Sequence, residues 1–156
     1  MRTGLDERFA AKPSRLSPEQ QSVDHEGQRL NISVIFTSET GTSAALKTAA
    51  SLANRLGGRI TLVVPEVVSY RLPLNQPPVS REWNEQRLRR LASQTTVETV
   101  VRFYLCRDRD ETLSKVLKPH SLVVVGGKKR WWPTFESRLA RRLRKFGHEV
   151  ILTETE

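Results

Sequence analysis

The feature that most constrains this chain is an apolar pattern that switches between two periods. Residues 32–36 (ISVIF) form a β-branched run typical of a strand, and residues 59–64 (RITLVV) form a second such run. Between them, apolar residues recur on one helical face from residue 43 to residue 56, and Gly57-Gly58 permit the positive φ that ends a helix. A helical crossover of about fourteen residues predicts parallel strands with right-handed winding.

The same alternation of strands and helices continues to the end of the chain. The pattern predicts helices over residues 79–93, 111–117 and 134–146, strands over residues 97–105, 121–125 and 149–153, and a proline-rich loop over residues 65–78. The strand 121–125 has an unbroken apolar run, which indicates burial on both faces. Five strands alternating with four helices specify an open α/β sheet with helices on both faces.

Polar residues before each helix and apolar residues along it give the expected helix starts and buried faces. We expect N-caps at Thr42 or Ser43, at Asp110 and at Thr134, because these side chains accept hydrogen bonds from free helical N–H groups. The expected buried stripes are Trp83, Arg87-Leu88 and Leu91 on the second helix and Phe135, Leu139, Leu143 and Phe146 on the fourth.

Length and composition indicate one domain. The chain has 156 residues, and we assign the domain to residues 31–156 and expect a disordered arm over residues 1–30, where no apolar period is sustained. With Cys106 as the single cysteine, the sequence excludes an internal disulfide and a cysteine-rich zinc site, and the three scattered histidines give no metal spacing. The absence of a long apolar run or a secretory signal predicts a soluble protein of the reducing cytoplasm.

Positive charge is concentrated near the C-terminus. The chain has 26 Lys and Arg against 17 Asp and Glu, a net charge of +9. Residues 128–146 contain one acid, Glu136, and these cations: Lys128, Lys129, Arg130, Arg138, Arg141, Arg142, Arg144 and Lys145. Such a field attracts polyanions, and Trp131-Trp132 add aromatic surfaces on which bases stack. The alternative interpretation is an ordinary solvated helix face.

Any ligand site is expected beyond the carboxyl ends of the strands, where open parallel sheets bind their ligands. The loops at that edge are residues 37–42, 65–68 and 126–134. Thr40-Gly41-Thr42-Ser43 lacks the spacing of a phosphate-binding P-loop, and we expect a capping turn there. No general base is placed beside Cys106, so the sequence predicts no catalytic nucleophile.

Two stretches of the chain resemble the universal stress protein family, and the resemblance covers about residues 31–156. They are AALKTAASLANRLGGRITLVV in the first half and, in the second, SLVVVGG followed after a loop by ESRLARRLRKFGHEVILTE. The resemblance implies a doubly wound sheet of the adenine nucleotide alpha hydrolase-like type, with strand order 3-2-1-4-5. It also implies a homodimer formed through the fifth strand, residues 149–153.

The ATP-binding branch of that family carries an Asp after the first strand and the pattern Gly-x2-Gly-x9-Gly-Ser/Thr after the fourth. In this sequence Thr37 stands at the Asp position, Gly126 matches the first Gly, and Lys129 replaces the second. Glu136-Ser137 stands where the closing Gly-Ser/Thr belongs, after a shorter loop. The Cβ of Lys129 restricts φ and the Glu136 carboxylate repels phosphate, so we expect a dismantled phosphate cradle.

Three hypotheses for the function follow. The first is a non-catalytic regulatory domain of the stress-response type, with no cofactor, no catalytic residue and no metal ligand. The second is a nucleic-acid or polyanion binding module that uses residues 128–145, with the candidates Trp131, Trp132, Arg138, Arg142 and Lys145. The third is an ATP-binding universal stress protein, whose nucleotide or anion site comprises Thr37, Ser38, Val64, Gly126, Gly127, Lys128, Lys129, Arg130 and Ser137.

Overall fold

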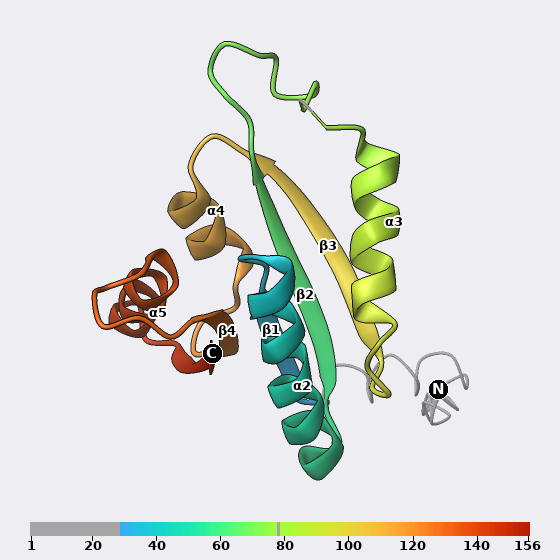
Figure 1. Ribbon diagram of the computed structural model, residues 1–156, viewed down its shortest axis with the longest axis vertical. Coiled ribbons are helices and arrows are strands. Elements are labelled where there is room, and N and C mark those ends of the chain that lie inside the picture. Colours follow the sequence, from blue (N-terminus) through green and yellow to red (C-terminus); the bar gives the residue numbers. More distant parts are fainter. Residues whose placement is uncertain (1–28, 78) are drawn as a thin grey trace, which may run out of the picture.

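The fold is a single parallel sheet with helices on both sides (Figure 1). The computed structural model describes residues 29–77 and 79–156, so the predicted arm lies almost wholly outside the described residues. The strand order is β3-β2-β1-β4-β5 with every pair parallel, which confirms the predicted topology. The elements are β1 (Asn31–Ile35), α2 (Glu39–Leu56), β2 (Arg59–Val67), α3 (Arg81–Ala92), β3 (Thr99–Cys106), α4 (Arg109–Val116), β4 (Leu122–Lys128), α5 (Phe135–Lys145) and β5 (Glu149–Thr155).

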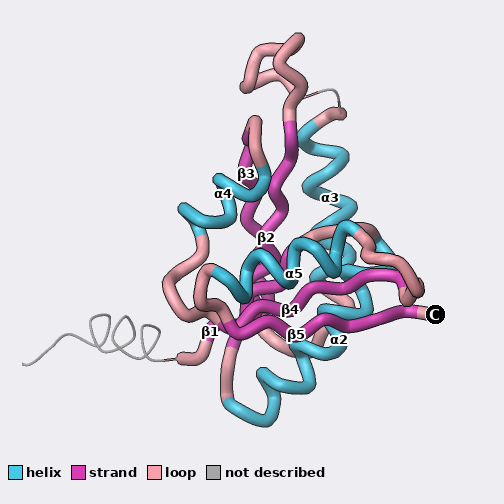
Figure 2. Tube along the Cα trace, turned by 90° about the vertical axis from the view of Figure 1, so that its left-hand side faces the viewer, coloured by secondary structure: helices cyan, strands magenta, loops and turns pink. Residues whose placement is uncertain are grey.

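The helices divide between the two faces of the sheet, and each face has its own apolar core (Figures 1 and 2). α2 and α3 cover one face, where Val34 and Leu88 are buried together. α4 and α5 cover the other, where Leu113 and Leu139 are buried together. The inner strand β4, which lies between β1 and β5, is buried on both faces along residues 123–125, as its apolar run predicted. Among the described residues, no helix combines the length and apolarity needed to cross a bilayer.

Helix α2 begins earlier than the sequence indicated, because its capping residue lies upstream. Ser38 is the N-cap, and its Oγ accepts a hydrogen bond from the N–H of Gly41 at 3.1 Å. Thr42 therefore lies inside the helix, where it is fully buried, and Ser43 follows it there. The prediction that Thr42 or Ser43 caps this helix was wrong.

For the two helices on the other face, the predicted N-cap of α4 was wrong and that of α5 is confirmed. Asp108, not Asp110, caps α4, and its carboxylate accepts from the N–H of Glu111 at 2.9 Å. Asp108 lies immediately before the helix and has the extended backbone angles that an N-cap requires, whereas Asp110 lies within the first helical turn. Thr134 caps α5 as predicted, with its Oγ1 accepting from the N–H of Ser137 at 3.2 Å.

β2 and β4 both run well past the ends that the sequence indicated, and the extension of β4 reaches the candidate site. β2 continues through Pro65, although proline was expected to start a loop. Odd-numbered residues of β2 point their N–H groups toward β1, which has already ended at Ile35, so Pro65 sacrifices no ladder hydrogen bond. β4 extends to Lys128, so Gly126 and Gly127 are strand residues and not the loop predicted for them.

Three aromatic residues predicted to face the core lie on the surface, although the leucines of the same stripes are buried or partly buried. Trp83, Phe135 and Phe146 are 56%, 42% and 58% exposed. Guanidinium groups cover two of these rings: Arg87 lies 5.2 Å from the centre of the Trp83 ring, and Arg109 lies 4.6 Å from that of Phe135. Cation–π contacts therefore take the place of core packing at both positions.

Candidate functional site

The carboxyl ends of β1 and β4 lie side by side, because these strands are neighbours in the sheet (Figure 1). Thr37 and Ser38 follow β1, and Gly126 lies near the end of β4, so the fold brings these predicted site residues together. The predicted contribution of β2 does not join them. The Val64 side chain is buried in the core beneath α2 and α3 and is 3% exposed.

Thr37 ties the two strand ends to each other. Its Oγ1 donates a hydrogen bond to the carbonyl oxygen of Gly126 at 2.6 Å. Its backbone N–H donates to Oγ1 of Thr42, a fully buried residue of α2, at 3.2 Å. The hydroxyl and the backbone N–H of Thr37 therefore join β1, α2 and β4 to one another.

A direct backbone contact between two glycines closes the space between the strand ends. A Cβ placed on Gly41, in the first turn of α2, would lie 2.5 Å from the carbonyl oxygen of Gly126, and a Cβ on Gly126 would lie closer still to Gly41. No ordinary side chain fits at either position, and no ligand atom fits between them. Sequence reasoning missed this role of Gly41, because it placed the glycine in a capping turn before the helix, whereas the helix already begins at Glu39.

The next glycine of the strand is covered by a side chain from α5. A Cβ on Gly127 would lie 2.8 Å from the Cβ of Glu136, so Glu136 packs against the segment that would cradle a phosphate. Ser137, the last matching residue of the nucleotide motif, donates through Oγ to the carbonyl oxygen of Thr134 at 2.9 Å. The N-terminus of α5, which attracts anions, already has its own carboxylate and its own cap.

Two hollows flank the closed contact. One of about 410 Å³ is lined chiefly by Ser38, Lys128, Arg130, Trp132, Glu136 and Arg138. Another of about 580 Å³ lies between α2, α3 and the end of β5, with Glu39, Lys47, Arg87 and Arg90 as its charged residues. Each combines three cations with one carboxylate, so both carry a net positive charge. In the second, the Nε atom of Arg87 lies 2.9 Å from Oε1 of Glu39.

The loop between β4 and α5 presents two tryptophans to solvent. Trp131 is 91% exposed and Trp132 is 49% exposed, with their ring centres 5.3 Å apart in an edge-on arrangement. The Arg130 guanidinium lies 5.6 Å from the centre of the Trp132 ring, and Lys128 and Lys129 are exposed beside it. The five consecutive residues form one cationic aromatic surface, which we call the 128–132 loop.

The predicted row of cations on α5 is interrupted by pairing within the fold. Arg142 forms an ion pair with Asp110 of α4, so its charge is neutralised. Arg144 donates to the carbonyl oxygen of Val150 in β5 at 3.0 Å. Arg138 and Lys145 are exposed, and within the described residues no ion pair joins either to a carboxylate.

The histidines of the domain lie at the opposite, amino edge of the sheet, as predicted. Burial, together with the nearby charge of His120, holds the pKa of His148 below its ordinary value. Neutral His148 accepts through Nδ1 a hydrogen bond from the N–H of Ser121 at 3.2 Å. Cys106 is buried at the end of β3. Across residues 29–77 and 79–156, no group of three or more His, Cys, Asp or Glu side chains is placed to hold a metal ion.

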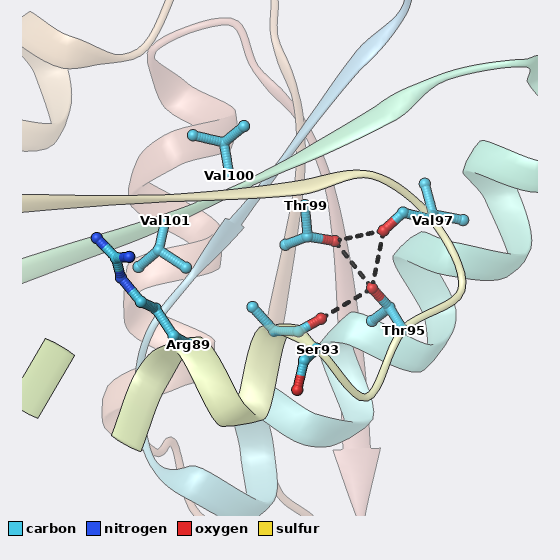
Figure 3. A pocket seen from close by; sticks show the side chains of 8 residues that line it. Arg89, Ser93, Thr95, Val97, Thr99, Val100 and Val101 are labelled. Atoms are coloured by element: carbon cyan, nitrogen blue, oxygen red, sulfur yellow. Dashed lines mark hydrogen bonds between the residues drawn. The ribbon is translucent and has the colours of Figure 1, made fainter. Parts of the chain in front are cut away.

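A further hollow of about 460 Å³, at the turn between α3 and β3, has no chemistry of its own (Figure 3). The Thr95 hydroxyl is hydrogen-bonded to the carbonyl oxygen of Ala92 at 3.0 Å and to Oγ1 of Thr99 at 2.9 Å. Arg89 is directed away from this threonine pair. The hydroxyl groups therefore hold the turn together and leave no convergent group for a ligand.

Comparison with solved structures finds proteins of similar architecture. A protein of the universal stress protein family from Burkholderia pseudomallei superposes with a TM-score of 0.56 at 19% sequence identity, over 80% of this chain and 96% of that chain. The chain has the universal stress protein fold. A universal stress protein from Archaeoglobus fulgidus superposes with a TM-score of 0.48 at 12% identity, over 80% of this chain and 97% of that one. No family model and no curated protein sequence matches this chain.

The glycine contact predicts that Gly126→Ala lowers the free energy of unfolding by about 3 kcal/mol, because the new methyl group meets backbone that cannot move aside. Chemical denaturation measures this loss. Gly127→Ala is the matched control, because its methyl group meets only the Glu136 side chain, so its smaller loss should be relieved by adding Glu136→Ala. Equal losses for the two alanine variants would contradict the contact.

Proposed function

We propose that this protein is a non-catalytic regulatory domain of the universal stress protein type that does not bind ATP at the carboxyl edge of its sheet. The observation that carries the proposal is the backbone contact of Gly41 with Gly126, which fills the crevice between β1 and β4. Ligands of open α/β sheets bind in that crevice. The fold that the chain shares with a universal stress protein supports the regulatory assignment. We propose that the protein acts in the cytoplasm.

Charge supports the same conclusion. Thr37 stands at the position of the family's Asp, and its hydroxyl is hydrogen-bonded to Gly126. Glu136 lies in the first turn of α5, against Gly127, where the family's ATP-binding branch has glycine. A carboxylate there repels phosphate groups, and the helix dipole that would attract them is already compensated.

The proposal assigns no catalysis, because the two serine hydroxyls of the candidate site, Ser38 and Ser137, are hydrogen-bonded to backbone groups at the starts of α2 and α5. Ser38 accepts from the N–H of Gly41, and Ser137 donates to the carbonyl oxygen of Thr134. Nucleophilic catalysis needs a hydroxyl or thiol within hydrogen-bond reach of a general base. Neither hydroxyl has a hydrogen bond to a side-chain base among the described residues.

A second candidate function is supported by the 128–132 loop: binding of nucleic acid or another polyanion. Trp131 is 91% exposed, which leaves a large apolar ring in water beside three cations. Aromatic rings next to Lys and Arg stack on bases while the cations neutralise phosphates. Because Arg142 and Arg144 are engaged within the fold, the loop and not the predicted α5 row is the centre of this surface.

We also propose a homodimer formed through β5, as the resemblance implies. β5 is an edge strand, and its even-numbered residues turn their N–H and C=O groups away from β4. Such an edge pairs readily with a second copy. Arg144 occupies the free carbonyl of Val150, so pairing is expected to centre on Leu152 and Glu154.

Mg-ATP is expected to raise the unfolding temperature no more than equimolar Mg-tripolyphosphate does, because the contact of Gly41 with Gly126 fills the crevice between β1 and β4 that the adenosine would enter. Thermal denaturation monitors the comparison, since a specific ligand stabilises the folded state in proportion to its occupancy. The variant Glu136→Gly should also show no ATP-specific shift, because the glycine contact persists in it. An ATP-specific rise in the wild-type protein would overturn the proposal.

For the second candidate function, changing Lys128, Lys129 and Arg130 together to Ser should elute the protein from heparin or immobilised DNA at a lower salt concentration. The reason is that each phosphate contact releases counterions and steepens the salt dependence. A matched variant changes the exposed residues Arg55, Arg71 and Arg89 to Ser, which removes the same charge elsewhere. Equal shifts in the two variants would show that net charge alone governs retention.

The dimer proposal predicts that Glu154→Pro weakens self-association about tenfold or more, because each chain loses one backbone donor at the shared edge. Sedimentation equilibrium measures the change. Glu154→Gln removes the charge and keeps the N–H, so it should associate like the wild-type protein. A wild-type chain that is monomeric at micromolar concentration would contradict the β5 dimer.

A further inference from the structure

A hollow of about 480 Å³ opens at the amino ends of the strands, at the edge opposite the candidate site. Its floor is the face of β1, β2 and β3 on the side of α4. α4 has 8 residues and β2 has 9, so the helix spans about 12 Å against about 30 Å for the strand. Helix α4 lies beside the carboxyl halves of β2 and β3 (Figure 1), and the lining of the hollow includes Arg59 and Thr61 from the amino half of β2. We call this space the amino-edge hollow.

The amino-edge hollow is lined by basic residues and by no carboxylate. Its charged and titratable lining residues, apart from Tyr104, are Arg29, Arg59, Arg102, Lys118 and His120. Arg29 is neutralised by Glu98, with Nη1 and Oε2 2.8 Å apart. In the part of the chain that the structure describes, no ion pair joins Arg59, Arg102 or Lys118 to an acid. Three cations from β2, β3 and the segment after α4 therefore surround one space, and no acid of residues 29–77 or 79–156 forms an ion pair with them.

The floor of the hollow is polar, although sheet faces beneath helices are normally apolar. Ser33 lies there and is 5% exposed, and the Thr61 hydroxyl donates to Oδ1 of Asn31 at 2.8 Å. That bond holds the Asn31 amide at the floor of the hollow. On the opposite face of the same strands, Ile32 and Ile60 are fully buried in the α2 core, so the polar residues are confined to the open face.

The rim of the hollow is held in place by the turn before β4. His120 has a positive φ of 55°, which is costly for a residue with a Cβ. Its Nδ1 atom lies 3.2 Å from the carbonyl oxygen of Gly147, a hydrogen bond that anchors the ring. Apolar side chains of Val63, Leu117 and Leu122 complete the lining. The hollow thus combines cations, hydrogen-bond donors and a limited apolar surface.

We propose that the amino-edge hollow binds a small organic anion that carries two or more phosphate or carboxylate groups. Arginine forks and a lysine recognise such groups, and three uncompensated cations call for more than one negative charge. The volume lies in the range of pockets for small ligands. The proposal is independent of the function assigned to the carboxyl edge, since the two sites lie at opposite ends of the strands.

The test titrates the full chain with pyrophosphate and, separately, with citrate by calorimetry. We expect one ion per chain for at least one probe, and which probe binds distinguishes a phosphate from a carboxylate ligand. The double variant Arg59→Gln, Arg102→Gln should weaken this binding at least about tenfold. Its control, Lys129→Gln with Arg130→Gln, removes the same charge from the 128–132 loop and should bind like the wild-type protein.

Nuclear magnetic resonance locates the bound ion. His120 lines the hollow, and Trp131 and Trp132 lie in the loop at the other edge, so imidazole and indole signals report separate sites. The proposal requires the His120 ring signals to move with the probe while the indole N–H signals stay in place. It is overturned if neither probe binds at millimolar concentration, if the indole signals move instead, or if the loop variant loses as much affinity as the double variant.

Discussion

The structure depends on the contact between the backbones of Gly41 and Gly126. A helix that begins immediately after a central strand must turn back over the sheet, and here its first turn rests directly on the neighbouring strand. Only the absence of a Cβ on both residues allows this approach. Thr37 adds a hydrogen bond across the same junction. The contact that packs α2 so closely also fills the space between the ends of β1 and β4, so the packing of the helix and the shape of this edge of the sheet have one cause.

The parallel α/β class could be predicted from the sequence, because it follows from the order of the hydrophobic periods and from the handedness of crossovers. The strand order came from the family resemblance and not from these periods. The element ends could not be predicted, because capping depends on which polar side chain reaches a free N–H. Ser38 and Asp108 do so, and Thr42 and Asp110, with the same chemistry, do not. Pro65 shows a related limit, since its place in β2 depends on where the neighbouring strand stops.

The candidate site could be predicted in outline. The rule that ligands lie beyond strand ends brought Thr37 and Gly126 into consideration, and the fold places them in contact. It misplaced Val64, because alternate residues of a strand face opposite sides and Val64 faces the core. It missed Gly41, because a close approach between a helix and a strand from distant parts of the chain leaves no local pattern.

Counting charges along the sequence also misses what the fold brings together from distant parts of the chain. The count therefore found the basic region at residues 128–146 and missed the amino-edge hollow. Residues 128–146 attract attention because their cations are consecutive, yet Arg142 is paired with Asp110 and Arg144 with a strand carbonyl. Arg59 and Arg102 are far apart in sequence and meet around one hollow only because β2 and β3 are paired. Cations that are clustered in the sequence are partly neutralised by contacts within the fold, and cations that are distant in the sequence are brought together by strand pairing. The electrostatic field that a ligand meets is therefore set by strand order more than by local composition.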